Sequence, residues 1–231
     1  MKKRFVFWGL FVFALQVAAY QLDCENVGTH LNELASADQQ IRQESNLLDQ
    51  NPKATTAERD AMQQRWRTID SENLKQFKEI IAACGWPKTK KESHSAWLLA
   101  QHADSDLAFQ RLARGLLEAS VKAGIAAPHD LAYLADRIAA SEGRSQEYGT
   151  QFLQSDRCHL VLDPVDNRER VNRRRWAIGL QSLEGYEAEG RRRFIPPDCP
   201  STTRSRKTKA LLEFECVDRL QAAKQQPSNP R

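Results

Sequence analysis

His102 occupies a position where an ordinary amphipathic helix would carry an apolar residue. At about 100° per residue, Leu98 and Leu99 lie about 100° and 200° from Trp97, and His102 falls between them at about 140°. We therefore expect the imidazole to point with the leucines into the core. It is then either a buried neutral ring held by a backbone or carboxylate partner, or a general base or ligand at the base of a pocket.

Asp136 and Arg137 form a second polar pair in a helix expected at about 129–141. Asp136 lies roughly opposite the apolar stripe of that helix, and Arg137 lies at its border beside Tyr133. On pattern alone Asp136 is a solvated surface acid, unless another segment covers its face. The apolar stripe itself consists of Leu131, Leu134 and Ile138.

Further polar residues flank these two positions. Asp104 follows His102 by two residues, where it could bind a ligand or serve as the N-cap of the next helix. Gln146, Tyr148 and Gln151 supply two amides and a phenol, which suit a neutral polar ligand and the bracing of a hairpin equally well. No nucleophile elbow, P-loop, dinucleotide-binding glycine motif or His-Glu-x-x-His occurs, and we expect neither a metal nor a cofactor.

The N-terminal 19 residues have the layout of a secretory signal peptide. A basic start, Lys2 to Arg4, precedes an uncharged and largely apolar run, with Val17 and Ala19 at the positions that a signal peptidase reads. We predict cleavage after Ala19, with an uncleaved anchor as the alternative. The apolar run is short for a membrane span. The mature protein is therefore expected to be periplasmic or secreted, without stable membrane insertion.

Removal of this signal changes the charge of the protein. The whole chain has 34 basic and 30 acidic residues, and the signal takes three basic residues with it, which leaves a net charge of +1. Residues 20–167 hold 16 basic and 22 acidic residues, whereas residues 168–231 hold 15 and 8. A nucleic-acid partner is not expected after export. The arginine runs at 173–175 and 191–193 suit an anionic envelope component or an acidic partner protein better.

All five cysteines lie in the mature chain, where an oxidising compartment favours pairing. Two amphipathic helices are predicted, from about Val27 to Leu48 and from Thr56 to Ala83, joined by a short loop. Such helices must run antiparallel. Cys24 and Cys84 then meet at the same end of the hairpin, and we predict that they form a disulfide. The pairing of the other three cysteines stays open.

Beyond the hairpin we predict shorter helices at about 93–103, 106–123 and 129–141, and a helix at 168–187. Within 148–162 we predict a small β-hairpin, with residues 154–157 as the loop between its strands. The expected fold class is mainly α, a long helical hairpin packed on a compact helical domain with one small β-hairpin. We divide the chain into a signal peptide (1–19), a helical domain (20–187, with the helical hairpin at 24–84) and a basic extension (188–231). A last amphipathic segment is expected at 209–222.

Four spaced motifs resemble a widespread bacterial family defined as a domain of unknown function. They are Gly85-Trp-Pro87, Trp97-Leu-Leu-Ala-Gln-His-Ala-Asp104, Tyr133-Leu-Ala-Asp-Arg137 and Gln146-Glu-Tyr-Gly-Thr-Gln151. The resemblance covers about residues 31–187 and implies no established activity. It does imply that the polar residues of these motifs belong together. The segment after Gly85-Trp-Pro87 departs from the family, because it is basic and polar here instead of apolar.

Two functions are consistent with these observations. In the first, His102 is a general base, Asp136 orients it and Arg137 is an anion or oxyanion clamp, in a hydrolase or binding protein for an envelope-derived glycan or peptide. The other pocket residues would be Asp104, Tyr133, Gln146, Tyr148 and Gln151. In the second, the protein is a periplasmic immunity protein or inhibitor that neutralises a toxin or effector, and the polar set is a buried network that specifies the fold. A purely structural envelope protein is a further alternative.

Overall fold

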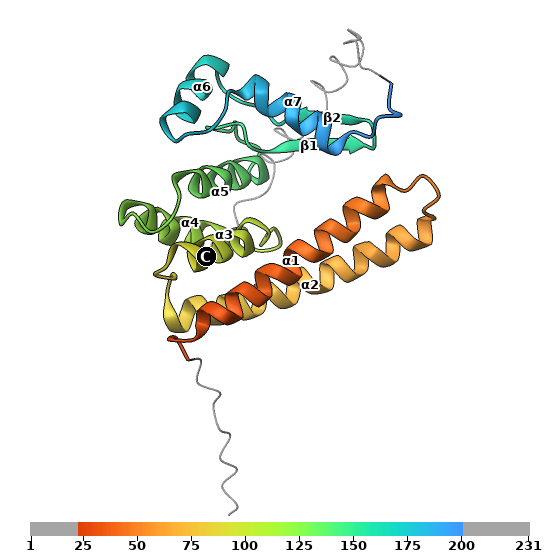
Figure 1. Ribbon diagram of the computed structural model, residues 1–231. Coiled ribbons are helices and arrows are strands. Elements are labelled where there is room, and N and C mark those ends of the chain that lie inside the picture. The colour runs from red at the N-terminus through yellow and green to blue at the C-terminus, as the bar shows by residue number, and fades with distance from the viewer. Residues whose placement is uncertain (1–22, 201–231) are drawn as a thin grey trace, which may run out of the picture.

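The computed structural model describes residues 23–200. The predicted signal peptide, the predicted segment 209–222 and Cys216 lie outside the described residues. The described chain is mainly helical with one two-stranded antiparallel sheet, which confirms the predicted fold class. Figure 1 shows the long helical hairpin on one side of a stack of shorter helices, with the sheet and the last two helices at the opposite end of the stack.

The helical hairpin consists of α1 (Val27–Gln50) and α2 (Thr56–Cys84). A capping box starts α2, since Thr55 accepts from the Glu58 N–H and the Glu58 carboxylate accepts from the Thr55 N–H. The two helices pack along each other and run antiparallel (Figure 1). At their shared end a disulfide joins Cys24 to Cys84, with 5.4 Å between the Cα atoms, which confirms the predicted pairing.

This disulfide closes a loop of 60 residues around the whole hairpin. Its removal frees the unfolded chain from that constraint, so the double variant Cys24→Ser/Cys84→Ser should lose about 4 kcal/mol of unfolding free energy. Urea denaturation of the oxidised mature protein and the variant measures the loss. A loss below about 1 kcal/mol would show that the hairpin is held by packing alone.

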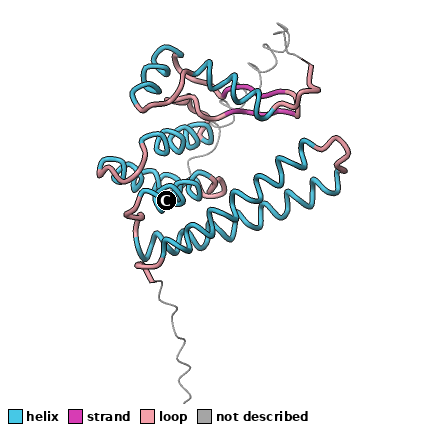
Figure 2. The backbone as a smooth tube through the Cα atoms, in the orientation of Figure 1, coloured by secondary structure: helices cyan, strands magenta, loops and turns pink. Residues whose placement is uncertain are grey.

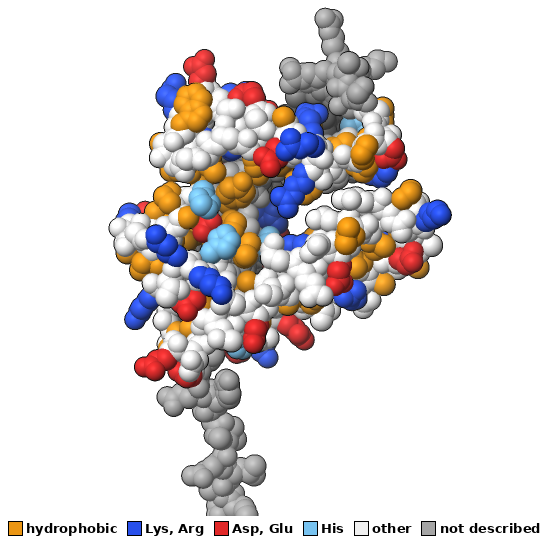
Figure 3. All heavy atoms as spheres, viewed as in Figure 1, with side chains coloured by type: hydrophobic (Ala, Val, Ile, Leu, Met, Phe, Trp, Pro, Cys, Tyr) orange, Lys and Arg blue, Asp and Glu red, His pale blue; other side chains and the backbone are white. Residues whose placement is uncertain are grey.

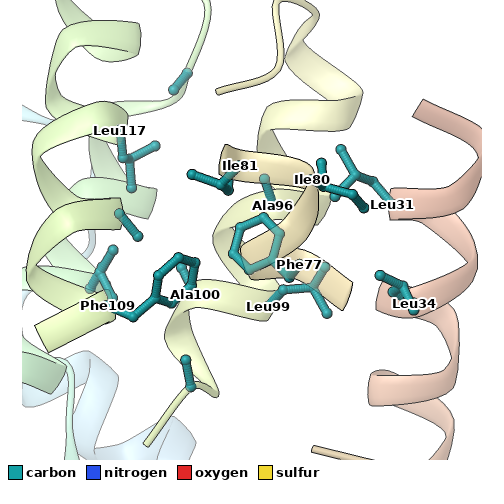
Figure 4. Packing of buried hydrophobic residues seen from close by; sticks show 14 of the residues in the cluster. Leu31, Leu34, Phe77, Ile80, Ile81, Ala96, Leu99, Ala100, Phe109 and Leu117 are labelled. Carbon is teal, nitrogen blue, oxygen red and sulfur yellow. The ribbon is translucent and has the colours of Figure 1, made fainter. Parts of the chain in front are cut away.

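The main core lies where the hairpin meets α3 (Lys90–Gln101), α4 (Leu107–Lys122) and α5 (Pro128–Ser141). Figure 4 shows Phe77 of α2 between Leu31 of α1 and Phe109 of α4. The rings of Phe77 and Phe109 meet edge to face with their centroids 5.4 Å apart. Burying an aromatic side chain of this kind stabilises the fold by about 2 kcal/mol. The core therefore fixes α3, which carries His102 at its C-terminal end, against α1.

The β-hairpin contains β1 (Phe152–Asp156) and β2 (His159–Leu162), paired Phe152 to Leu162 (Figure 2). Its turn is tighter than predicted, because residues 154–156 continue β1 instead of forming the loop. A second disulfide, Cys158–Cys199, ties this turn to the segment after the last helix. The sequence had left this pairing open.

The prediction of a single helix at 168–187 is wrong. The chain forms α6 (Arg168–Ala177) and then α7 (Leu183–Phe194). Gly179 has a φ of 77°, and the N–H groups of Gly179 and Leu180 donate to the carbonyls of Trp176 and Arg175. This is a Schellman termination, in which glycine takes the left-handed position. Ser182 then caps α7 by accepting from the Gly185 N–H.

Glu184 links α7 to α6 through hydrogen bonds from Asn172 and Arg168. The bond from Asn172, followed by the backbone N–H bond and Arg168, lowers the pKa of Glu184 from 4.5 to about 2. Because the folded pKa is depressed, this stabilisation is present above pH 4.5 and is lost as the pH falls toward 2. Its size is below about 1 kcal/mol, since the carboxylate is largely exposed.

The variant Glu184→Gln isolates this charge effect, because its amide oxygen can still accept from Asn172. We expect the stability difference between wild type and variant to shrink between pH 4.5 and pH 2, measured by urea denaturation at each pH. A difference that stays constant over that interval would contradict the assignment.

Among residues 23–200, none of the helices combines the length and apolar character that crossing a bilayer requires.

Candidate functional site: a histidine held by a buried carboxylate

His102 lies at the C-terminal cap of α3, with its side chain 19% exposed. Its Nδ1 lies 3.0 and 2.9 Å from the two carboxylate oxygens of Asp38 on α1. Asp38 is 1% exposed. A carboxylate only accepts hydrogen bonds, so in a neutral imidazole this contact requires the ring proton on Nδ1 and leaves the lone pair on Nε2. The imidazole is thereby oriented by a partner 64 residues away in the sequence.

The Asp38 carboxylate is not isolated in the core. The Arg42 guanidinium, one turn along α1, contacts it at 2.6 Å. Arg42 also donates to both oxygens of Asp70 on α2, at 3.1 and 3.3 Å, and Trp66 donates to Asp70 at 2.8 Å. Burial raises the pKa of Asp70, against the lowering effect of Arg42. A continuous polar chain therefore runs from α2 through α1 to the ring of His102.

The Nε2 atom of His102 ends this chain. Within residues 23–200 it has no hydrogen-bond partner, whereas Nδ1 is fully engaged. An imidazole that is fixed through Nδ1, with a side chain that is 19% exposed and an Nε2 that has no partner, has the arrangement of a general base when the ring is neutral. In the neutral ring, Nε2 is therefore the nitrogen that would take up a proton.

Asp136 does not orient His102, which corrects the predicted role. Its carboxylate accepts from the N–H groups of Glu147, Tyr148 and Thr150, at 2.8 to 3.2 Å, and from the Thr150 hydroxyl at 3.0 Å. It is fully buried, because this loop covers the face of α5 opposite the apolar stripe, which the sequence pattern did not assign to the core. Burial raises the pKa of Asp136, and the four donors act in the opposite direction. Asp136 therefore anchors the 147–150 loop.

Arg175 of α6 holds the same loop from the other side. Its guanidinium is buried and donates to the carbonyls of Tyr148, Gly149 and Gln181 at 2.7, 3.2 and 2.6 Å. It also lies 4.7 Å from the ring centroid of Tyr186. Burial lowers the pKa of Arg175. The loop peptides thus lie between a buried anion and a buried cation, an arrangement that the sequence analysis missed.

Gly149 allows this packing of the loop. Its φ is 64°, in the left-handed region, and a Cβ built there would lie 2.6 Å from Leu183 Cδ1. Gln146 completes the loop, since its side chain accepts from the Gln151 N–H at 2.7 Å and donates to the Gln151 carbonyl at 3.1 Å. These amides brace the start of the hairpin, which is one of the two uses the sequence allowed.

Arg137 is engaged within the protein. Its Nε donates to Asp104 at 2.8 Å, its Nη2 contacts the same carboxylate, and its Nη1 donates to the Gln151 side chain at 3.2 Å. The expected capping role of Asp104 is wrong, because Asp106 caps α4 by accepting from the Phe109 N–H. Arg137 and Asp104 remain partly exposed, at 34% and 50% of their side chains.

The two tyrosines pack beside this cluster. The ring of Tyr133 meets Trp97 and Tyr186 edge to face, with centroids 6.0 and 6.3 Å apart, and its carbonyl accepts from the Gln151 side chain. Tyr148 contributes its backbone to the anchored loop, and burial raises the pKa of its phenol. The structure thus divides the predicted set into a brace around the loop, an Arg137–Asp104–Gln151 cluster, and the His102–Asp38 pair.

A hollow of about 680 Å³ lies between the far end of the helical hairpin and the β-hairpin with α7. Asn46 of α1 lines it, two helical turns beyond Asp38 on the same face, which corresponds to about 12 Å along the axis. Arg42 lies between them on that face. Figure 3 shows this hollow as an open notch with Lys and Arg side chains at its edge. Within residues 23–200, no cluster of three or more His, Cys, Asp or Glu side chains has a metal-binding arrangement.

Comparison with known protein families gave one match. The model of a family of unknown function, DUF6624, covers residues 26–189. That range includes the four motifs and every residue of the polar chain that runs from α2 through Asp38 to His102. No curated protein and no solved structure matched this sequence.

Proposed function

We propose that this chain, which belongs to the family of unknown function DUF6624, is an exported hydrolase that uses His102 as its general base. The observation that carries the proposal is the pairing of Nδ1 with the buried carboxylate of Asp38, while Nε2 has no partner among the described residues. Export is supported by the signal-like N-terminus and by the two disulfides, which fit an oxidising compartment.

The chemistry we propose is the hydrolysis of an amide bond in an envelope-derived peptide or glycan–peptide. Nε2 of His102 takes a proton from water, and the water oxygen adds to the carbonyl carbon. Collapse of the adduct breaks the bond to nitrogen, and the imidazolium returns its proton to the leaving amine. Asp38 stabilises the imidazolium while it exists, because its carboxylate contacts Nδ1.

The mature protein with both disulfides intact provides the test. It is incubated with purified envelope peptides and glycan–peptides, and new amine ends are identified by mass spectrometry. We expect products from the wild type and a large loss of product from His102→Gln. A folded wild-type protein that releases no more product than His102→Gln, on any fraction, would overturn the proposal.

The immunity or inhibitor alternative has a separate observation in its favour. Arg191, Arg192 and Arg193 lie exposed in the last turn of α7, and Asp136 and Gln146 serve internal structure. An acidic toxin surface would fit such a run. Under this alternative, Arg191→Glu would weaken toxin binding measured by calorimetry, whereas His102→Gln would leave it unchanged.

A further inference from the structure

The hollow beside the helical hairpin has two walls that are fixed independently of any ligand. On one wall, Arg59 donates to the Asp49 carboxylate at 2.7 Å and to the Asn51 carbonyl at 3.1 Å, which closes the tip of the helical hairpin. On the other wall, Arg157 pairs with Asp198 at 2.7 Å, and the disulfide Cys158–Cys199 ties the β-turn to the segment after α7. Such a preformed concavity avoids much of the ordering cost of binding.

Three amide side chains that line the hollow take no part in holding these two walls in place. The side chains of Asn46, Gln50 and Gln154 line the hollow and make no hydrogen bond within residues 23–200. Each amide offers two donors and one acceptor oxygen. These three side chains therefore present a neutral hydrogen-bonding surface of the kind that sugar hydroxyl groups match.

Arg193 and Phe194 complete the lining from the end of α7. The Arg193 guanidinium lies 5.4 Å from the Phe194 ring centroid and has no carboxylate partner in the described part of the chain. Phe194 is 38% exposed, so part of its ring is accessible to a ligand. An unpaired guanidinium can bind a carboxylate through two parallel hydrogen bonds, and an exposed ring can cover the apolar face of a pyranose.

We propose that this hollow binds a saccharide that carries a carboxylate. Arg193 pairs with the carboxylate, Phe194 covers one sugar face, and Asn46, Gln50 and Gln154 bond to hydroxyl groups. Binding in the hollow requires no chemistry at His102, so this proposal is tested independently of the proposed hydrolysis. A longer ligand could extend along α1, where polar side chains follow one another from the exposed Asn46 past the half-buried Arg42 toward the buried Asp38.

Isothermal titration calorimetry with tetragalacturonate as the probe tests this site on the mature protein. Arg193→Gln should weaken binding by about tenfold or more, since it removes a charge-assisted pair. Arg192→Gln is the matched control, because Arg192 is an exposed neighbour on α7 that does not line the hollow. That control should change Kd by less than about twofold, while Phe194→Ala should weaken binding.

Two further probes identify the ligand class. Maltotetraose, a neutral sugar of the same length, should bind at least about tenfold more weakly than tetragalacturonate. Tetraglutamate should also bind more weakly, since a peptide lacks the ring face and the hydroxyl groups. The proposal is overturned by undetectable tetragalacturonate binding, by equal effects of Arg193→Gln and Arg192→Gln, or by either comparison probe binding as tightly. Equal binding by tetraglutamate would point to an acidic-peptide surface instead.

Discussion

Exchanging His102 for Gln is expected to reduce the rate of hydrolysis by about 10³-fold, the middle of the range for loss of a general base. The amide of Gln can still bond to Asp38 from the same place, so the polar chain between the helices is retained. What it lacks is a basic nitrogen at the position of Nε2. Initial rates of amine release at saturating substrate measure the effect, and equal rates would contradict it.

Asp38 supports the same step without touching the substrate. In Asp38→Asn the amide can donate to Nδ1, which moves the ring proton to Nε2 and removes the base. Asp70→Asn is the control, because Asp70 also binds Arg42 but has no contact with His102. Both variants lose stability through Arg42, whereas only Asp38→Asn should lower the rate per folded molecule, by about 10²-fold or more.

Asp136→Asn should lower the free energy of unfolding by about 4 kcal/mol, as expected for breaking one side of a buried charged network. Only one oxygen remains to serve the donors of Glu147, Tyr148 and Thr150, and the new amide group points its own N–H atoms at them. The substitution also removes the buried negative charge that favours the Arg175 cation. Urea denaturation followed by circular dichroism gives the difference.

Asp130 provides a matched control for this stability change. It is also a buried acid on α5, but its contacts are with the half-exposed rings of His94 and His129, at 3.2 and 3.3 Å. Burial raises the pKa of Asp130, because it disfavours the ionised carboxylate. We expect Asp130→Asn to change stability by less than about 1 kcal/mol. If Asp136→Asn cost no more than this control, the loop anchor would be refuted.

The sequence was sufficient for the helical hairpin and its disulfide, because a short loop between long amphipathic helices leaves only an antiparallel arrangement. It failed at residues 168–187, where the pattern continues across Gly179 and only the glycine itself signals the break. The β-turn was placed too early for a related reason, since polar residues 154–156 sit on the exposed part of a strand. In each failure a local signal was weaker than the pattern around it.

The candidate site was predicted only in part. His102 stood out because it breaks an apolar stripe, and Asp38 carries the same signal, lying four residues after Leu34 and three before Ile41 on the buried face of α1. The pairing of the two could not be deduced, since it depends on how α1 packs on α3. Arg175 is similar, one turn after the buried Val171. Buried polar residues could therefore be found from the sequence, but their partners required the tertiary structure.

The position of the ring proton on His102 tests the central claim most directly. Long-range ¹H–¹⁵N correlation spectra of the mature protein distinguish a protonated ring nitrogen from a bare one. For the neutral ring we predict a protonated Nδ1 and an unprotonated Nε2 in the wild type and in Asp70→Asn, and the reverse tautomer in Asp38→Asn. A wild-type ring protonated on Nε2 would contradict the account, because His102 would then have no base to offer.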